Sequence, residues 1–308
     1  MNALFDKLRN QIFRDGPLTV AQYMDAAMTD PDHGYYTTRD PLGARGDFIT
    51  SPEISQIFGE LIGLWCAAVW QSMGSPKAFR WIELGPGRGT LMADAIRATA
   101  KVPGFHEAVN LHMVDASSVL KSQQQQILAN SNISNREWHN DLSQVPEGPV
   151  ICIANEFFDA LPVRHFQRIV AGWRERMIGL NETKDGLAFL LGNEMAPQHF
   201  IPEGLREAPD GALVETSPVS LRIMHTLADR IANTGGAALI IDYGHAESAH
   251  GETLQAMQNH KYTDVLDVPG EQDLTAHVDF ATLGKIASDA GATVHGPTEQ
   301  GEFLNNLG

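Results

Sequence analysis

The chain of 308 residues carries 38 acidic and 22 basic residues, which gives a formal net charge of −16. Such a charge repels phosphate backbones, so general nucleic-acid binding is not expected, whereas a basic substrate would be attracted. The hydrophobic share of 43% is ordinary for a globular protein with a buried core. Cys66 and Cys152 lie in apolar stretches and indicate buried thiols in a reducing compartment, with the cytoplasm as the expected location.

The N-terminal region is expected to be helical and then irregular. Residues 1 to about 30 predict two short helices separated at Gly16-Pro17, and their acidic residues argue against a secretory signal. Residues 31–55 are dense in Gly, Pro, Asp and Thr, and predict a long functional loop, which we expect to cover the active site as a lid. A helix is expected over about 52–73. No run is apolar for long enough to span a bilayer, so no membrane association is expected.

From residue 80 onwards the pattern alternates between strand and helix, which predicts an α/β fold with a Rossmann-like, doubly wound parallel sheet. The expected strands are 80–84, 111–116, a weak one around 136–140, 149–155 and 235–244. The expected helices between them are 89–100, 117–130 and 217–233.

Residues 163–215 differ from this pattern, because they alternate as antiparallel strands do, with a turn near 181–186. We interpret this segment as an inserted antiparallel β subdomain that covers the mouth of the site. The predicted organisation is an N-terminal helical segment and active-site cover (1–75), a Rossmann-like core (76–162 and 216–308) and the insertion (163–215).

The strongest local motif is Glu83-Leu84-Gly85-Pro86-Gly87-Arg88-Gly89-Thr90, which runs from a strand through a glycine turn into a helix. Glycines let the backbone approach a ligand closely, and a helix N-terminus offers free N–H groups. A dinucleotide fingerprint requires a glycine where Thr90 stands, and no Lys-Ser/Thr pair follows as in a P-loop. The carboxylate of Glu83 would repel a pyrophosphate but suits the ammonium and sulfonium of S-adenosylmethionine. A glycine-rich turn that binds nothing is the alternative.

Two further carboxylates follow predicted strands. Asp115, followed by Ala116, ends the second strand and is expected to hydrogen-bond a ribose diol. Asp141 and Leu142 follow the weak third strand, where a carboxylate could accept a hydrogen bond from the adenine amino group. A solvated carboxylate at a strand end is the alternative for Asp115.

The fourth strand ends in Asn155-Glu156-Phe157-Phe158-Asp159, where ligands and chemistry gather in open α/β sheets. Asn155 is a candidate cofactor residue, and the carboxylates of Glu156 and Asp159 are candidate catalytic groups that could orient a guanidinium. The alternative is that these residues cap a helix, with Asn155 at the N-cap.

Several long blocks of the sequence carry a resemblance to known proteins: HGYYTTRDPLGARGDFITSPEISQIFGELIG, ELGPGRGTL, ANEFFDALPV, IIDYGH, DLTAHVDF and QGEFLNNLG. Together they resemble the MidA family, which comprises bacterial proteins and mitochondrial assembly factors of respiratory complex I, and the resemblance spans residues 10–308. The resemblance implies a class I S-adenosylmethionine-dependent methyltransferase, and its mitochondrial member methylates protein arginine in a complex I core subunit.

The resemblance also assigns residues. It implies that Glu83, Gly85, Gly87 and Gly89 form the cofactor loop, and that Asp115 replaces the family's usual Glu. It makes Gly46, Asp47, Phe48, Thr50, Ser51 and Pro52 part of the active-site cover, with the last three near the cofactor. Tyr243 and His245 fall in the block after strand five, and Tyr243 and His277 are further catalytic candidates.

Other expectations stay open. Family members continue beyond the Gln-Gly-Glu-Phe-Leu block into a hairpin that completes the sheet, whereas this sequence ends at Gly308, so missing edge strands are expected. No metal site is expected, because the histidines of the C-terminal third lack short paired spacing. The alternatives to an arginine methyltransferase are an assembly chaperone without turnover and a small-molecule methyltransferase. A homodimer is left open.

Overall fold

The computed structural model describes residues 2–38 and 50–308, which form two compact units. One unit contains residues 42–158, 223–242 and 284–308, and the other contains 1–41, 159–222 and 243–283. This division differs from the predicted one in two ways. The predicted insertion, 163–215, lies in one unit with residues 1–41 and 243–283. The helix predicted at 52–73, which was assigned to the N-terminal segment, lies in the same unit as the parallel strands. Within the described residues, no helix combines the length and apolar character needed to cross a membrane.

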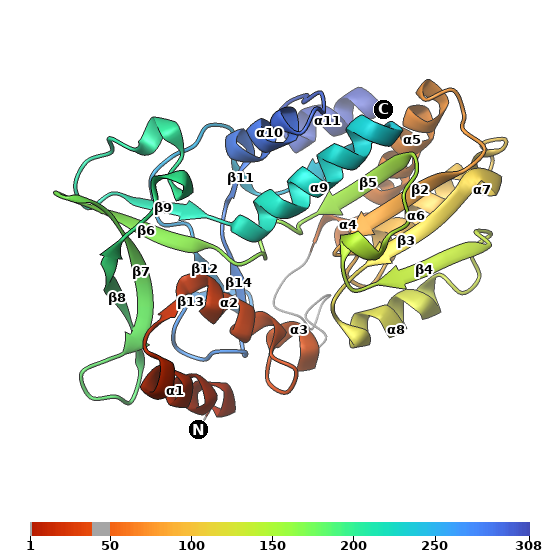
Figure 1. The fold of residues 1–308 in the computed structure, drawn as a ribbon. Helices are drawn as coiled ribbons and strands as arrows, with labels where there is room; N and C mark the ends of the chain where they lie inside the picture. The colour runs from red at the N-terminus through yellow and green to blue at the C-terminus, as the bar shows by residue number, and fades with distance from the viewer. Residues whose placement is uncertain (1, 39–49) are drawn as a thin grey trace. The chain divides into compact units, whose positions relative to one another are not determined.

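The first unit, which we call the Rossmann-like unit, is built on a five-stranded parallel sheet (Figure 1). In spatial order its strands are β10 (Gly236–Ile241), β5 (Val150–Asn155), β2 (Phe79–Leu84), β3 (Val109–Val114) and β4 (Asn135–His139). The chain moves outward from β2 through β3 to β4 and then returns to the other side of β2 with β5. The strand order therefore reverses between β2 and β5, and ligands bind at such a switch point beyond the carboxyl ends of the strands.

Helices bury the apolar side chains of this sheet, and their bounds are α4 (Ser51–Ile54), α5 (Gln56–Ser72), α6 (Thr90–Thr99), α7 (Phe105–Ala108), α8 (Ser118–Ile127) and α11 (Gln300–Leu307). A 3-10 turn, η1, follows β4 at Leu142–Gln144. The core contains Ile62, Cys66, Phe79, Trp81, Met92, Phe105, Leu111, Met113, Ile151 and Ile153. Cys66 and Cys152 are both buried free thiols, as the sequence predicts. The helix expected over 52–73 is interrupted, because Ser55 adopts an extended backbone between α4 and α5.

The second unit is largely antiparallel. Its main sheet has the order β1 (Leu18–Thr19), β7 (Gly172–Leu180), β6 (Arg164–Ile169), β9 (Leu213–Thr216), with β8 (Leu187–Met195) paired to β7. Two smaller sheets are β13 (Lys261–Thr263), β12 (Gln255–Gln258), β14 (Asp273–Thr275) and the pair β11 (Gly244–His245), β15 (Val278–Asp279). The helical elements are α1 (Ala3–Asp15), α2 (Val20–Thr29), α3 (Tyr35–Thr38), η2 (Gln198–Phe200) and η3 (Glu203–Leu205). Unit boundaries fall within α9 (Pro218–Thr234) and α10 (Phe280–Asp289), and also after Phe158 and after Asp242.

Candidate functional site

In the turn after β2, the backbone conformation at Gly85 and Gly87 disfavours any residue other than glycine. Gly85 has a φ of 60° and Gly87 a φ of 53°, in the left-handed region that favours glycine. A Cβ added at Gly85 would also lie 2.7 Å from Cδ2 of Phe157. Because α6 begins at Thr90, the glycine turn leads directly into the N-terminus of a helix at the switch point, where the first N–H groups have no partner within the helix.

Glu83 is the buried carboxylate beside this turn. It is 3% exposed, and its Oε2 has no hydrogen-bond partner within the part of the chain that the structure describes. Burial, and then the charge of Asp115, raise the pKa of Glu83 to about 8. A buried carboxylate without a partner is costly, and a bound cation would remove that cost.

Asp115 at the end of β3 is held by neighbours that the sequence pattern did not identify. The Gln124 Nε2 donates to Asp115 Oδ2 at 2.9 Å and to the Gly87 carbonyl at 2.8 Å. Trp138 Nε1 donates to Gln124 Oε1 at 3.1 Å, which fixes the amide orientation. The buried Gln124 therefore connects the candidate ribose carboxylate to the glycine turn. Its place in a run of four glutamines gave no signal for this role.

The candidate adenine residues follow β4, next to the end of β3. The Asp115 N–H donates to the His139 carbonyl at 3.0 Å, which joins the two strand ends. Asp141 is exposed, and its Oδ1 accepts from the Ser143 N–H at 2.8 Å and thereby caps η1. Leu142 is buried and Ala116 is exposed. One Asp141 oxygen is thus used locally, and contact with adenine stays a prediction.

The segment that begins at Thr50 contacts both the glycine turn and the end of β5. The Ser51 N–H donates to Glu156 Oε1 at 3.4 Å, and Thr90 Oγ1 donates to Glu53 Oε1 at 2.7 Å. Pro52 is buried. The structure therefore brings Thr50, Ser51 and Pro52 to the switch point, together with Glu53, which no local sequence pattern indicates. Gly46, Asp47 and Phe48, with the rest of the predicted lid at 39–49, lie outside the described residues.

Glu156 has an unusual backbone and a perturbed carboxyl group. Its φ of 48° is rare for a residue with a side chain, and such strain is often kept at functional positions. Burial raises its pKa, against hydrogen bonds from the Ser51 N–H and Asn155 Nδ2. No helix begins after β5, so the hypothesis that Asn155 and Asp159 cap one is wrong.

Asp242, at the end of β10, supports the turn after β5 instead of a helix cap. Its Oδ2 accepts from the N–H groups of Phe157 at 3.2 Å and Phe158 at 2.9 Å. No role for this residue is predicted from the sequence, although it lies near the end of the predicted strand 235–244. Asp242 therefore fixes the strained backbone at Glu156.

The other catalytic candidates lie in the second unit, where the structure brings their backbones together. The Ala276 N–H donates to the Asp159 carbonyl at 2.9 Å, and the Val278 N–H donates to the Tyr243 carbonyl at 2.9 Å. His277 lies between these donors and is exposed, Tyr243 is 55% exposed, and Asp159 is 7% exposed. His245 lies in β11, two residues after Tyr243. Their catalytic roles stay predictions.

The family profile described as "Putative S-adenosyl-L-methionine-dependent methyltransferase" matches residues 61–298. The chain belongs to this methyltransferase family. The mouse protein named "Protein arginine methyltransferase NDUFAF7, mitochondrial" is 40% identical over 333 residues, covering 100% of this chain and 75% of the relative. The Drosophila melanogaster homologue is 40% identical, covering 99% of this chain and 75% of its own length.

A crystal structure of a superfamily member from Burkholderia thailandensis, bound to S-adenosyl-homocysteine, has the same fold. It matches with a TM-score of 0.85 and 27% identity, over 99% of this chain and 81% of its own. The predicted resemblance, the α/β fold and the cofactor S-adenosylmethionine are therefore confirmed. The protein is an S-adenosylmethionine-dependent methyltransferase.

The residues at the switch point fit this cofactor. S-adenosylmethionine supplies an electrophilic methyl group on a sulfonium, and its amino-acid portion carries an ammonium. Among the residues that the structure describes, none hydrogen-bonds Glu83 Oε2, which suits that ammonium, and the absence of side chains at Gly85 and Gly87 allows a close approach. Asp115 and the exposed Asp141 would hold the nucleoside.

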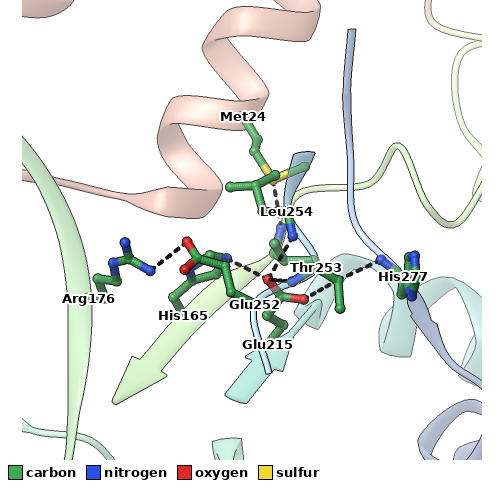
Figure 2. A network of polar contacts seen from close by, with 9 residues as sticks. Met24, His165, Arg176, Glu215, Glu252, Thr253, Leu254 and His277 are labelled. Carbon is green, nitrogen blue, oxygen red and sulfur yellow. Dashed lines mark hydrogen bonds and ion pairs between the residues drawn. The ribbon is translucent and has the colours of Figure 1, made fainter. Parts of the chain in front are cut away.

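A polar network in the second unit of the methyltransferase fixes the chain near His277 (Figure 2). The Glu215 side chain is 8% exposed; it accepts from the N–H groups of Thr253 at 3.0 Å and Leu254 at 3.1 Å, and lies 3.0 Å from His165 Nε2. Thr253 Oγ1 in turn accepts from the His277 N–H at 2.8 Å. Burial raises the pKa of Glu215, but the His165 and Thr253 hydrogen bonds outweigh it, so the net shift is downward.

Proposed function

We propose that this methyltransferase transfers the methyl group to an arginine side chain of a protein partner. The observation that carries the proposal is the 40% identity, over the full chain, to proteins named protein arginine methyltransferase. The net charge of −16 supports a basic acceptor, because it attracts cationic segments. We further propose the cytoplasm as the compartment, which two buried free thiols support, and leave a homodimer open.

The proposed role of Glu156 follows from its position beyond β5. Its carboxylate would hold the guanidinium through paired hydrogen bonds and keep positive charge away from the attacking nitrogen. That nitrogen forms a bond to the methyl carbon as the sulfur–methyl bond breaks, and a proton then leaves the nitrogen. Alignment and exclusion of water supply most of the acceleration. Asp159, Tyr243 and His277 are proposed to contribute further acceptor contacts.

The test is product analysis with isotopically labelled S-adenosylmethionine. The full chain would be incubated with arginine-containing peptides, the same peptides with Lys in place of Arg, and a small-molecule extract, and products would be identified by mass spectrometry. Methylarginine in the Arg peptides alone is expected. Transfer only to a small molecule would replace the proposal, and cofactor binding without any transfer would favour the assembly-chaperone alternative.

Glu156→Gln tests the carboxylate separately. We expect kcat to fall about 100-fold while the cofactor affinity changes by less than about threefold, because the amide keeps the shape and loses the charge. Ser143→Ala, near the cofactor site but remote from the acceptor role, is the matched control. Unchanged transfer by Glu156→Gln would remove Glu156 from the mechanism and leave arginine specificity to be judged from the products.

A further inference from the structure

Three side chains of the kind that bind transition metals meet on one face of the parallel sheet. His112 lies in β3, and Glu137 and His139 lie in β4. The strand pairing places His112 opposite Glu137 and Val114 opposite His139. Because side chains two residues apart on a strand share a face, all three groups project from the same face. None of them has a role in the cofactor or acceptor assignments above.

The separations of the three ligand atoms match a single ion. His112 Nδ1 lies 2.9 Å from His139 Nε2, and Glu137 Oε2 lies 4.0 Å from the first nitrogen and 3.7 Å from the second. The point equidistant from the three atoms lies inside their triangle, about 2.1 Å from each, which is the length of zinc–nitrogen and zinc–oxygen bonds. The two nitrogens now share a hydrogen bond, so the proton between them must move to another ring nitrogen or leave when both nitrogens bind the ion.

The burial of the cluster suits a site with three protein ligands and an open position. His112 is 1% exposed, whereas the Glu137 side chain is 57% exposed, so an ion and a water molecule can enter from the Glu137 side. Arg80 and Arg230 act electrostatically on His112, and Lys121 acts on His139. These cations weaken the binding of another cation, so we expect micromolar rather than tighter affinity.

We propose that His112, Glu137 and His139 bind one divalent first-row transition-metal ion, for which Zn²⁺ is the probe. Two imidazoles and one carboxylate suit such ions, and the fourth position would hold water. The ion would tie the edge strand β4 to β3. It would also steady the adjoining strand ends, because the His139 carbonyl accepts the hydrogen bond from the Asp115 N–H. The proposal is independent of the methyl acceptor.

The experiment is calorimetric titration of the full, chelator-treated chain with Zn²⁺, followed by Co²⁺ spectroscopy. We expect one ion per chain with micromolar Kd, visible d–d bands with Co²⁺, and a thermal midpoint about 5 °C higher at 100-fold excess over Kd. Glu137→Gln and His139→Asn should each lower the affinity by at least about tenfold. Glu137 is mostly exposed, so its substitution should leave the fold intact, which circular dichroism would check.

His250→Gln, an exposed histidine outside the cluster, is the matched control and should bind as the unsubstituted chain does. Absence of micromolar binding by the unsubstituted chain would overturn the proposal. Equal binding by Glu137→Gln, His139→Asn and His250→Gln would overturn it too, because the ion would then be held elsewhere.

Discussion

Glu83 makes the unliganded protein sensitive to pH. Its pKa is about 8 in the folded chain, above the ordinary value of 4.5, so between these values the folded chain holds a proton that the unfolded chain releases. The free energy of unfolding should therefore decrease as pH rises from about 5 to 8, by at most about 1.4 kcal/mol per pH unit. Urea unfolding at several pH values, without cofactor, should show this decrease, and Glu83→Gln should reduce it. Parallel curves for the two proteins would contradict the assignment.

The same carboxylate should control cofactor affinity in the opposite direction. Only its ionised form attracts an ammonium, so S-adenosylmethionine should bind more tightly as pH rises towards 8, with release of a proton. Glu83→Gln should weaken binding about 10- to 100-fold and abolish this pH dependence. Calorimetry in buffers of different ionisation enthalpy measures both effects. An unchanged affinity would mean that the ammonium lies elsewhere.

Functional residues that lie together in a short sequence motif can be predicted from the sequence, whereas residues that reach the site only through tertiary contacts cannot. Glu83 and the glycines are consecutive between a strand and a helix, so their motif is readable. Gln124 and Asp242 act through hydrogen bonds to residues 9 and 84 or more positions away, respectively, and neither has a local pattern. His112 and Glu137 are likewise joined only by strand pairing.

At the scale of elements, close packing of α5 on α6 should make one glycine irreplaceable. A Cβ at Gly63 would lie 2.6 Å from both Cα and the carbonyl oxygen of Ala95. We expect Gly63→Ala to lower the free energy of unfolding by about 1–3 kcal/mol, despite the better helix propensity of Ala. The control is Gly284→Ala in α10, where the nearest atom is 3.4 Å away and a gain of about 0.5–1 kcal/mol is expected. Equal effects in urea unfolding would refute the packing argument.

The Glu215 network should stabilise the second unit at neutral pH. The pKa of Glu215 is lowered on folding, so its contribution is present above about pH 4.5 and disappears as pH falls through the folded value. Glu215→Gln should lower the free energy of unfolding at pH 7 by about 1–3 kcal/mol, with a smaller difference below pH 4. Glu252→Gln, in the more exposed pair with Arg176, should cost less than about 0.5 kcal/mol. A larger loss of unfolding free energy for Glu252→Gln than for Glu215→Gln would contradict the argument that burial makes the Glu215 hydrogen bonds the more stabilising ones.

The elements of the Rossmann-like unit could be predicted because buried parallel strands are continuous apolar runs separated by helices. The antiparallel character of the insertion and its turn between β7 and β8 were also predicted, since alternation is local. The pairing of strands from distant parts of the chain could not be predicted. β1 pairs with β7 across about 160 residues, and β11 pairs with β15 across about 30. These pairs are held by backbone hydrogen bonds, which do not depend on a particular residue type.

At the scale of the whole molecule, the net charge of −16 should act on acceptor encounter. A basic arginine peptide is attracted over a distance that shrinks as salt is added, because the screening length falls from roughly 20 Å to below 10 Å between about 20 and 200 mM ionic strength. We expect kcat/KM for such a peptide to fall about tenfold over that range, mainly through KM. Cofactor affinity measured in the same buffers separates this effect from screening at Glu83. A peptide with the same arginine but flanking glutamates is the matched control and should show the reverse trend. Equal salt dependence for both peptides would mean that the acceptor is selected by contacts at the site and that the overall charge has no part in recognition.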